Sequence, residues 1–237
     1  ARLLEESNPE QVFNISTALM SMLLKEAGRA ESLAIEVPAE SDINLLIDLC
    51  FKLIDSVPDG GNTPEFITGQ LLESYQEQIN SGIQVDGHKE GASTTSTTSN
   101  KPGDITEKSA DGAVLAVYEI TMKPFDDQRI SDSEDTVKRF IEETGQQIQE
   151  INVICRESDV HPDVIPATNT KYHLGTFIFR NITYQFYEIH LWIVAALSRL
   201  IPSNRAMFYK SINEYIAAPN TSEKVKKFWK QLHERGS

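Results

Sequence analysis

The sequence feature that most limits the fold of this chain is the run AVLAVYEITMK at residues 113–123, its strongest strand signal. Two shorter segments precede it: the alternating GIQVDG at 82–87, and GDITEK at 103–108, which leads into a turn at SADG, residues 109–112. We therefore expect three consecutive β-strands in the middle of the chain.

Helical patterns lie on both sides of these strands. One helix should open with Thr63 as N-cap, Pro64 in its first position and Glu65 in its first turn. A second helix is predicted in SDSEDTVKRFIEETGQQ, capped by Ser131 or Ser133, and INVICRE then returns to strand. The order helix, three strands, helix, strand predicts an α/β fold with a mixed central sheet flanked by helices.

Three regions follow from these patterns. Residues 1–57 should be a helical N-terminal region, residues 63–155 the α/β core, and residues 156–237 a mainly helical C-terminal region packed on the core. The turn PDGGNT marks the first boundary. In the first region Ser41-Asp42 should cap a second helix, and the first helix should bury an apolar stripe made of Val12, Ile15, Leu19, Met22 and Leu23. In the last region TYQFYEIHLWIVAALSRL, residues 183–200, should be one buried helix.

Composition limits the class of protein. A chain of 237 residues with 40% hydrophobic residues can fill a real core. The sequence lacks an apolar run near 20 residues and a secretory leader, so we expect a soluble cytoplasmic protein with no membrane partner. The chain starts at Ala1 rather than Met, which indicates a processed or excised part of a longer polypeptide. Cys50 and Cys155 lie in apolar stretches and should be buried thiols.

The net charge of −13 argues against nucleic-acid binding, since phosphates attract Lys and Arg. The distribution weakens this objection, because the stretch from Arg199 to the C-terminus carries a net +5 and the preceding 198 residues carry −18. A basic face on an acidic body is therefore allowed, although a charge run is more often a solvated helix surface.

The candidate site is formed by acidic residues of two neighbouring strands. Hydrolysis of a phosphodiester needs metal ions, and hard divalent ions prefer carboxylate oxygens on rigid supports. Alternation along VYEITMK should project Glu119, Thr121 and Lys123 to one face. A hairpin at 109–112 would bring Asp104 beside Glu119. Asp111 is an alternative to Asp104, but its Asp-Gly pair is typical of a hairpin turn.

Two short motifs around Asp104 and Glu119 resemble those of a known protein superfamily. K-P-G-D-I followed by E-I-T-M-K resembles the Pro-Asp…(Asp/Glu)-x-Lys signature of the PD-(D/E)xK restriction-endonuclease-like superfamily, and the predicted element order is similar to its common core. The resemblance covers residues 63–155 and implies a restriction-endonuclease-like fold with helical N- and C-terminal additions. Two departures are visible: Gly103 separates Pro102 from the Asp, and Thr121 stands where the family has Lys.

The resemblance also implies roles. Asp104 and Glu119 would bind Mg²⁺, or Mn²⁺ in its place, with the backbone carbonyl of Ile120 as a further ligand. Lys123 would position the attacking water in place of the family's Lys, with Thr121 as an accessory residue. Glu73 would be an accessory carboxylate from the first core helix; an exposed helix acid is an equally good reading.

Polar residues around the predicted site are candidate DNA contacts. They lie in the tract before the second strand and just beyond the third, and exposed surface positions explain them as well: Ser99, Asn100, Lys101, Gln128 and Arg129. The five histidines show no paired metal spacing.

Taken together, the residues and the resemblance predict a magnesium-dependent endonuclease of double-stranded DNA, similar to type II restriction enzymes. The resemblance further implies a homodimer in the cytoplasm of a prokaryotic cell. Two alternatives stay open: a catalytically inactive interaction module of a defence or repair system on the same fold, and a repair or recombination nuclease of the same superfamily. Metal-dependent cleavage of DNA separates the first alternative from the prediction, and the pattern of DNA fragments separates the second.

Overall fold

The computed structural model describes residues 9–33, 40–89 and 101–234 of the chain. These residues form two compact units, one made of Ala1–Val37 with Ile216–Ser237 and the other of Pro38–Tyr215. The larger unit contains the whole sheet and the candidate site, and the two units are described separately below.

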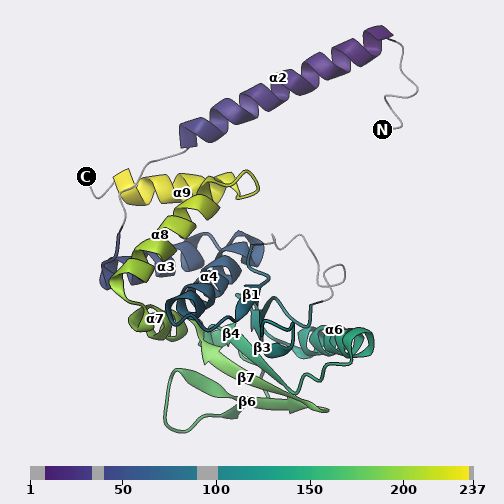
Figure 1. Ribbon diagram of the computed structural model, residues 1–237, viewed down its shortest axis with the longest axis vertical. Coiled ribbons are helices and arrows are strands. Elements are labelled where there is room, and N and C mark those ends of the chain that lie inside the picture. The colour runs from purple at the N-terminus through teal and green to yellow at the C-terminus, as the bar shows by residue number, and fades with distance from the viewer. Residues whose placement is uncertain (1–8, 34–39, 90–100, 235–237) are drawn as a thin grey trace. The chain divides into compact units, whose positions relative to one another are not determined.

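A mixed seven-stranded sheet lies at the centre of the larger unit (Figure 1). Its spatial order is β1-β2-β3-β4-β7-β6-β5. The three central strands β3, β4 and β7 run parallel, and the outer pairs on both sides are antiparallel. In chain order the strands are β1 (Gln84–Asp86), β2 (Ile105–Lys108), β3 (Val114–Ile120), β4 (Glu150–Cys155), β5 (Ile165–Pro166), β6 (His173–Phe179) and β7 (Ile182–Glu188).

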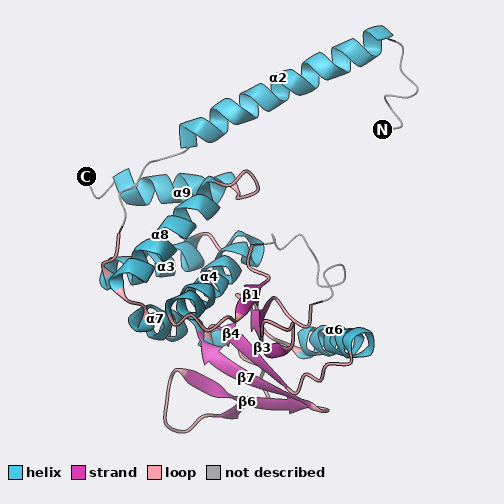
Figure 2. Ribbon diagram, in the orientation of Figure 1, coloured by secondary structure: helices cyan, strands magenta, loops and turns pink. Residues whose placement is uncertain are grey.

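Helices cover both faces of this sheet (Figure 2). On one face α6 packs against a core of alternate strand residues that includes Val117, Val153 and Phe186. On the other face lie α4 and α7, which α3 covers in turn. The helices of the larger unit are α3 (Ile43–Ser56), α4 (Asn62–Gln78), α6 (Asp127–Thr144), α7 (Ile189–Arg199) and most of α8 (Pro202–Ala217), with short 3₁₀ turns η1 (Asp59–Gly61) and η2 (Glu157–Asp159).

The predicted order of the core is confirmed, because α4, β1, β2, β3, α6 and β4 follow one another as helix, three strands, helix and strand. The hairpin between β2 and β3 also lies where the SADG turn predicts it, with the Gly112 amide donating to the Ser109 carbonyl at 2.9 Å. Gly112 has φ 86°, a left-handed conformation that glycine adopts without strain.

Two predicted helix starts are displaced. The N-cap of α4 is Gly61 rather than Thr63. The cap of α6 is Asp126, whose side chain accepts from the Arg129 amide at 3.1 Å, so this helix begins before the predicted serines 131 and 133. An aspartate closer to the strand competes for the same capping role. The cap of α3 is Asp42, as predicted.

The prediction of one helix over residues 183–200 is wrong. Its first part is strand β7, and α7 begins only at Ile189. Alternation explains the difference, since Ile182, Tyr184 and Phe186 are buried in the α6-side core while the residues between them face the other way. A strand buried on both faces looks apolar all round, as a buried helix does.

The smaller unit contains α2 (Pro9–Leu33) and α9 (Glu223–Glu234). Helix α9 buries Val225 and Trp229 while Lys224 and Lys227 stay exposed. In α2 the predicted burial of the apolar stripe is wrong: Leu19 is 60% exposed and Met22 67%. Helical spacing predicts that a stripe exists, but not that another element covers it.

Both cysteines are buried free thiols, as predicted, and burial raises the pKa of each. Among the described helices, none has the length and apolar character needed to cross a lipid bilayer.

Candidate functional site

The carboxyl groups of Asp104 and Glu119 meet where β2 begins and β3 ends. The antiparallel register pairs Ile105 with Tyr118, which places Asp104 opposite Glu119. The backbone amide of Ile120 donates to Asp104 Oδ2 at 2.8 Å and fixes this carboxylate against the strand. The predicted convergence of the two acids therefore follows from the hairpin register.

The two carboxyl groups are strongly coupled. Burial, followed by the negative charge of Asp104, raises the pKa of Glu119 well above its ordinary value. Burial also raises the pKa of Asp104, against the opposing effects of the Ile120 amide and the Arg129 charge. A hydrogen bond joins the two carboxyl groups. Two acids this close cannot both ionise at low cost unless a proton or a cation lies between them.

This donor set fits a hard divalent cation. Within the described residues, no group of three or more histidine, cysteine and acidic side chains is arranged to hold a metal ion. A cation on Asp104 and Glu119 would thus complete its coordination with water and backbone oxygen. Mg²⁺ commonly binds proteins in this way, through one or two carboxylates while it keeps several waters.

A cavity of about 190 Å³ opens at this point. Its lining comes from the turn before α4, from the beginning of β2, and from the residues that follow β3. Gly60 and Gly61, with φ 71° and 115°, form one wall in left-handed conformations that favour glycine. The cavity therefore gives a small substrate group access to the edge of the acidic pair.

Thr121 and Lys123 do not continue the strand. β3 ends at Ile120, and the Thr121 hydroxyl donates to the Lys123 carbonyl at 2.9 Å and accepts from the Lys123 amide at 3.1 Å. Alternation along a strand therefore does not decide the position of Lys123, because the chain turns before this residue. Lys123 does line the cavity, but among the described residues no ion pair joins its ammonium to either acid. Its predicted role stays a prediction.

Arg129 brings a positive charge to the site from the first turn of α6. Its Nη1 donates to the Thr121 hydroxyl at 3.0 Å, and its charge lowers the pKa of both Asp104 and Glu119. The sequence marked Arg129 only as a DNA contact. A sequence prediction with Asp126 as the N-cap would have placed Arg129 in the first turn of the helix, close to the end of β3.

The first core helix contributes Glu65 rather than Glu73. Glu65 lines the cavity, and its charge further raises the pKa of Glu119. The structure places Glu73 in another cavity, 2.6 Å from the Lys89 ammonium and 3.4 Å from His88 Nε2. The nearby His88 ring, followed by Lys89, lowers the Glu73 pKa to about 2. Glu65 lies in the first turn of α4, directly after the glycine turn. This position next to the turn is the sequence signal that could have identified Glu65 as a site residue.

The other predicted contacts are dispersed. Ser99 and Asn100 lie outside the described residues. Lys101 is half-buried at the start of the next described segment. The Gln128 amide donates to Asp132 on the exposed side of α6 at 2.8 Å. Asp111 occupies the β2–β3 turn with the Ser109 hydroxyl, as the turn reading predicted.

We compared the chain with protein-family models and with curated proteins. No protein-family model matches the chain, and no curated protein is significantly similar to it.

Proposed function

We propose that this protein is a metal-dependent endonuclease that hydrolyses phosphodiester bonds in double-stranded DNA, on a restriction-endonuclease-like core. The observation that carries the proposal is the pair of coupled, half-buried carboxyl groups of Asp104 and Glu119, of which Asp104 lines a cavity. With neither a proton nor a cation between the two acids this arrangement is unfavourable, and such pairs are typical of functional sites.

In this proposal Asp104 and Glu119 hold Mg²⁺, with Mn²⁺ able to replace it and the Ile120 carbonyl as a candidate third ligand. The bound ion would supply Lewis acidity toward the phosphate and acidify a water molecule. Arg129, held by Thr121 at 3.0 Å, offsets negative charge on the scissile phosphate. Lys123, which also lines the cavity, would contact the phosphate backbone or the attacking water.

We further infer sequence-specific cleavage of the type II restriction class, a homodimer that cuts both strands, and a place in the prokaryotic cytoplasm. These inferences rest on the resemblance of the K-P-G-D-I and E-I-T-M-K motifs. An inactive interaction module on the same fold is the second candidate, favoured by Thr121 at the place of the family's Lys. A repair or recombination nuclease is the third.

Cleavage of supercoiled plasmid tests the proposal. We expect discrete fragments with Mg²⁺ and none with EDTA. Asp104→Asn and Glu119→Gln should remove cutting while circular dichroism shows a folded protein. Glu142→Gln is the matched control, because Glu142 is an exposed acid on α6. Intact plasmid from folded wild-type protein, across several metals and DNA sequences, would reject an enzyme and leave the inactive module. A smear or junction-selective cutting would indicate the repair class.

A further inference from the structure

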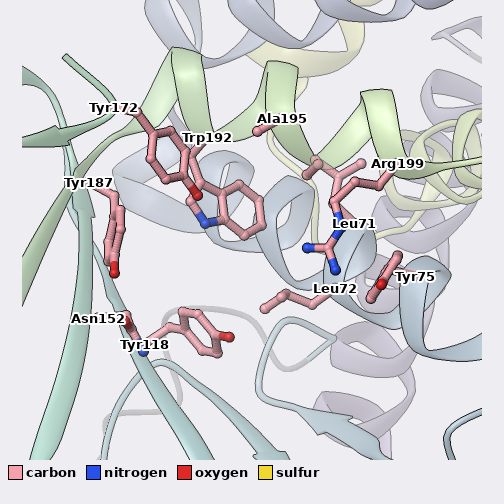
Figure 3. A pocket seen from close by; sticks show the side chains of 11 residues that line it. Leu71, Leu72, Tyr75, Tyr118, Asn152, Tyr172, Tyr187, Trp192, Ala195 and Arg199 are labelled. Carbon is pink, nitrogen blue, oxygen red and sulfur yellow. The ribbon is translucent and has the colours of Figure 1, made fainter. Parts of the chain in front are cut away.

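A second cavity, of about 290 Å³, lies on the opposite face of the sheet from α6 (Figure 3). The sheet contributes Tyr118, Asn152 and Tyr187, which alternate with the core residues that face α6. Helices α4 and α7 form the other walls. This volume is close to the lower end of the range for small-molecule pockets.

Aromatic rings dominate the lining of this cavity. They come from four different elements and from the segment before β6, so the sequence gives no local motif for them. Tyr172 and Tyr187 lie with ring centroids 5.3 Å apart and tilted by 57°. Figure 3 shows the Trp192 indole and the Tyr118 phenol facing the same space. The rings are Tyr75, Tyr118, Tyr172, Tyr187 and Trp192.

One cation is placed among these rings. The Arg199 guanidinium lies 3.6 Å from the centroid of the Tyr75 ring. Gln78 holds the backbone at this point, since its side-chain amide donates to the Arg199 carbonyl at 2.9 Å. Among the described residues no carboxylate forms an ion pair with Arg199, although the chain carries a net charge of −13. The guanidinium donors are thus available to an anion from outside.

Other polar groups of the cavity also lack protein partners. Within the described part of the chain, the Trp192 indole N–H and the hydroxyls of Tyr172 and Tyr187 make no hydrogen bond to protein. Trp192 is only 8% exposed, and burial raises the pKa of both tyrosines. By contrast, the Tyr118 hydroxyl donates to Glu107 at 2.9 Å and is already satisfied. None of these three groups is a fully buried atom without a partner, so each is open to the cavity and can form a hydrogen bond with a ligand there.

We propose that this cavity binds a nucleotide, with the base stacked among the aromatic rings and the phosphate on Arg199. Base–aromatic stacking accepts any base, while an arginine fork binds phosphate oxygens in pairs. The free indole and phenol groups would bind acceptor atoms on the base edge or sugar. The inference goes beyond the proposed nuclease activity and does not depend on it, because the two sites lie on different faces of β3.

The ligand can be a free mononucleotide or a base of a single strand, and both present the same ring and phosphate. Isothermal titration calorimetry with nucleoside 5′-monophosphates, the matching nucleosides, inorganic phosphate and a short single-stranded oligonucleotide separates the two sources. We expect saturable binding of monophosphates, at least tenfold tighter than of nucleosides or phosphate, if the free nucleotide is the source. Tighter binding of the oligonucleotide than of any monophosphate assigns the site to a strand.

Variants make the test specific to this cavity. Arg199→Gln should weaken nucleotide binding at least tenfold and leave nucleoside binding unchanged, and Trp192→Leu should weaken both. Arg139→Gln, on α6 across the sheet, is the matched control, and Glu119→Gln should bind as the wild type does. Circular dichroism checks the fold of each variant. No heat from any nucleotide with folded protein, equal binding by Arg199→Gln, or tighter binding of an aromatic carboxylate than of nucleotides would overturn the proposal.

Discussion

The two faces of the central sheet carry opposite chemistry, although neighbouring residues of one strand supply both. On the α6 side, Glu119 joins Asp104 in an acidic pair in which the pKa of both groups is raised. On the α4 and α7 side, the adjacent Tyr118 lines an aromatic cavity in which Arg199 lies over the Tyr75 ring. Alternation along β3 would thus separate the proposed cation site from the proposed ring-binding site by one residue.

The largest expected effect is on catalysis. Glu119→Gln and Asp104→Asn should each reduce the cleavage rate on the order of 10²-fold or more, since each removes a charge that the cation needs while keeping the shape of the side chain. The Asn retains an oxygen for the Ile120 amide. Tyr118→Phe, the neighbouring change on the other face, should leave the rate within a few fold. Single-turnover cleavage of plasmid DNA measures the rate of each variant. A loss of rate in Tyr118→Phe as large as that in the two acid variants would remove the distinction between the faces.

The second effect distinguishes the two basic side chains of the site, Arg129 and Lys123. Arg129→Gln should slow cleavage roughly tenfold to a hundredfold, because its charge acts on both acids, whereas Lys123→Gln should change the rate by a smaller factor. A larger loss in Lys123→Gln, with Arg129→Gln near wild type, would return the catalytic role to the lysine of the motif. The same cleavage assay provides the comparison, with salt kept constant because DNA affinity depends on it.

A third effect concerns stability and pH. The folded chain raises the pKa of Glu119, so it holds the Glu119 proton better than the unfolded chain does. The free energy of unfolding of the metal-free protein should therefore fall as pH rises above the ordinary glutamate value, by about 1.4 kcal/mol for each unit of pKa difference. Glu119→Gln should lack this slope and be the more stable protein at neutral pH.

Divalent metal should reverse this third effect. Mg²⁺ is expected to raise the melting temperature of the wild type by a few degrees and that of Glu119→Gln by less. Thermal unfolding followed by circular dichroism, with and without the metal, measures the change in melting temperature of each protein. Identical metal responses in the two proteins would contradict a cation on Glu119.

The smallest effect is expected at Glu73, which belongs to neither site. The pKa of Glu73 is lowered to about 2, so its contact with His88 and its ion pair with Lys89 contribute stability above the ordinary value of 4.5, and this stability is lost as pH falls toward 2. Glu73→Gln should cost on the order of 1 kcal/mol or less at neutral pH, because solvent screens a partly exposed pair. The difference should shrink below pH 4.5. Urea unfolding at several pH values measures this difference in stability. A changed cleavage rate in Glu73→Gln would show that α4 couples Glu73 to the acidic site.

Much of the core could be predicted from the sequence, because local signals agree there. The alternation in residues 113–123 and the SADG turn place Asp104 beside Glu119 correctly. Prediction failed where a decision depends on tertiary structure. Residues 183–188 look equally apolar as strand and as helix, and only their place between β4 and β6 decides.

The site was predicted less fully than the core. Lys123 follows Thr121 by two residues, but the strand ends before either, so the rule for strands does not apply to them. Arg129 and Glu65 reach the acids from helix ends, whose direction depends on packing. The aromatic cavity has no sequence signature, since its rings meet only after the chain has folded.

The central claim is that Asp104 and Glu119 share one divalent cation. A crystal grown with Mn²⁺ and measured at the manganese absorption edge tests it directly, with Glu119→Gln treated alike as the control. The wild type should show one anomalous peak within roughly 2.0–2.3 Å of an oxygen from each carboxylate, and the variant none. A wild-type map without a peak between these two side chains, at saturating Mn²⁺, would contradict the account.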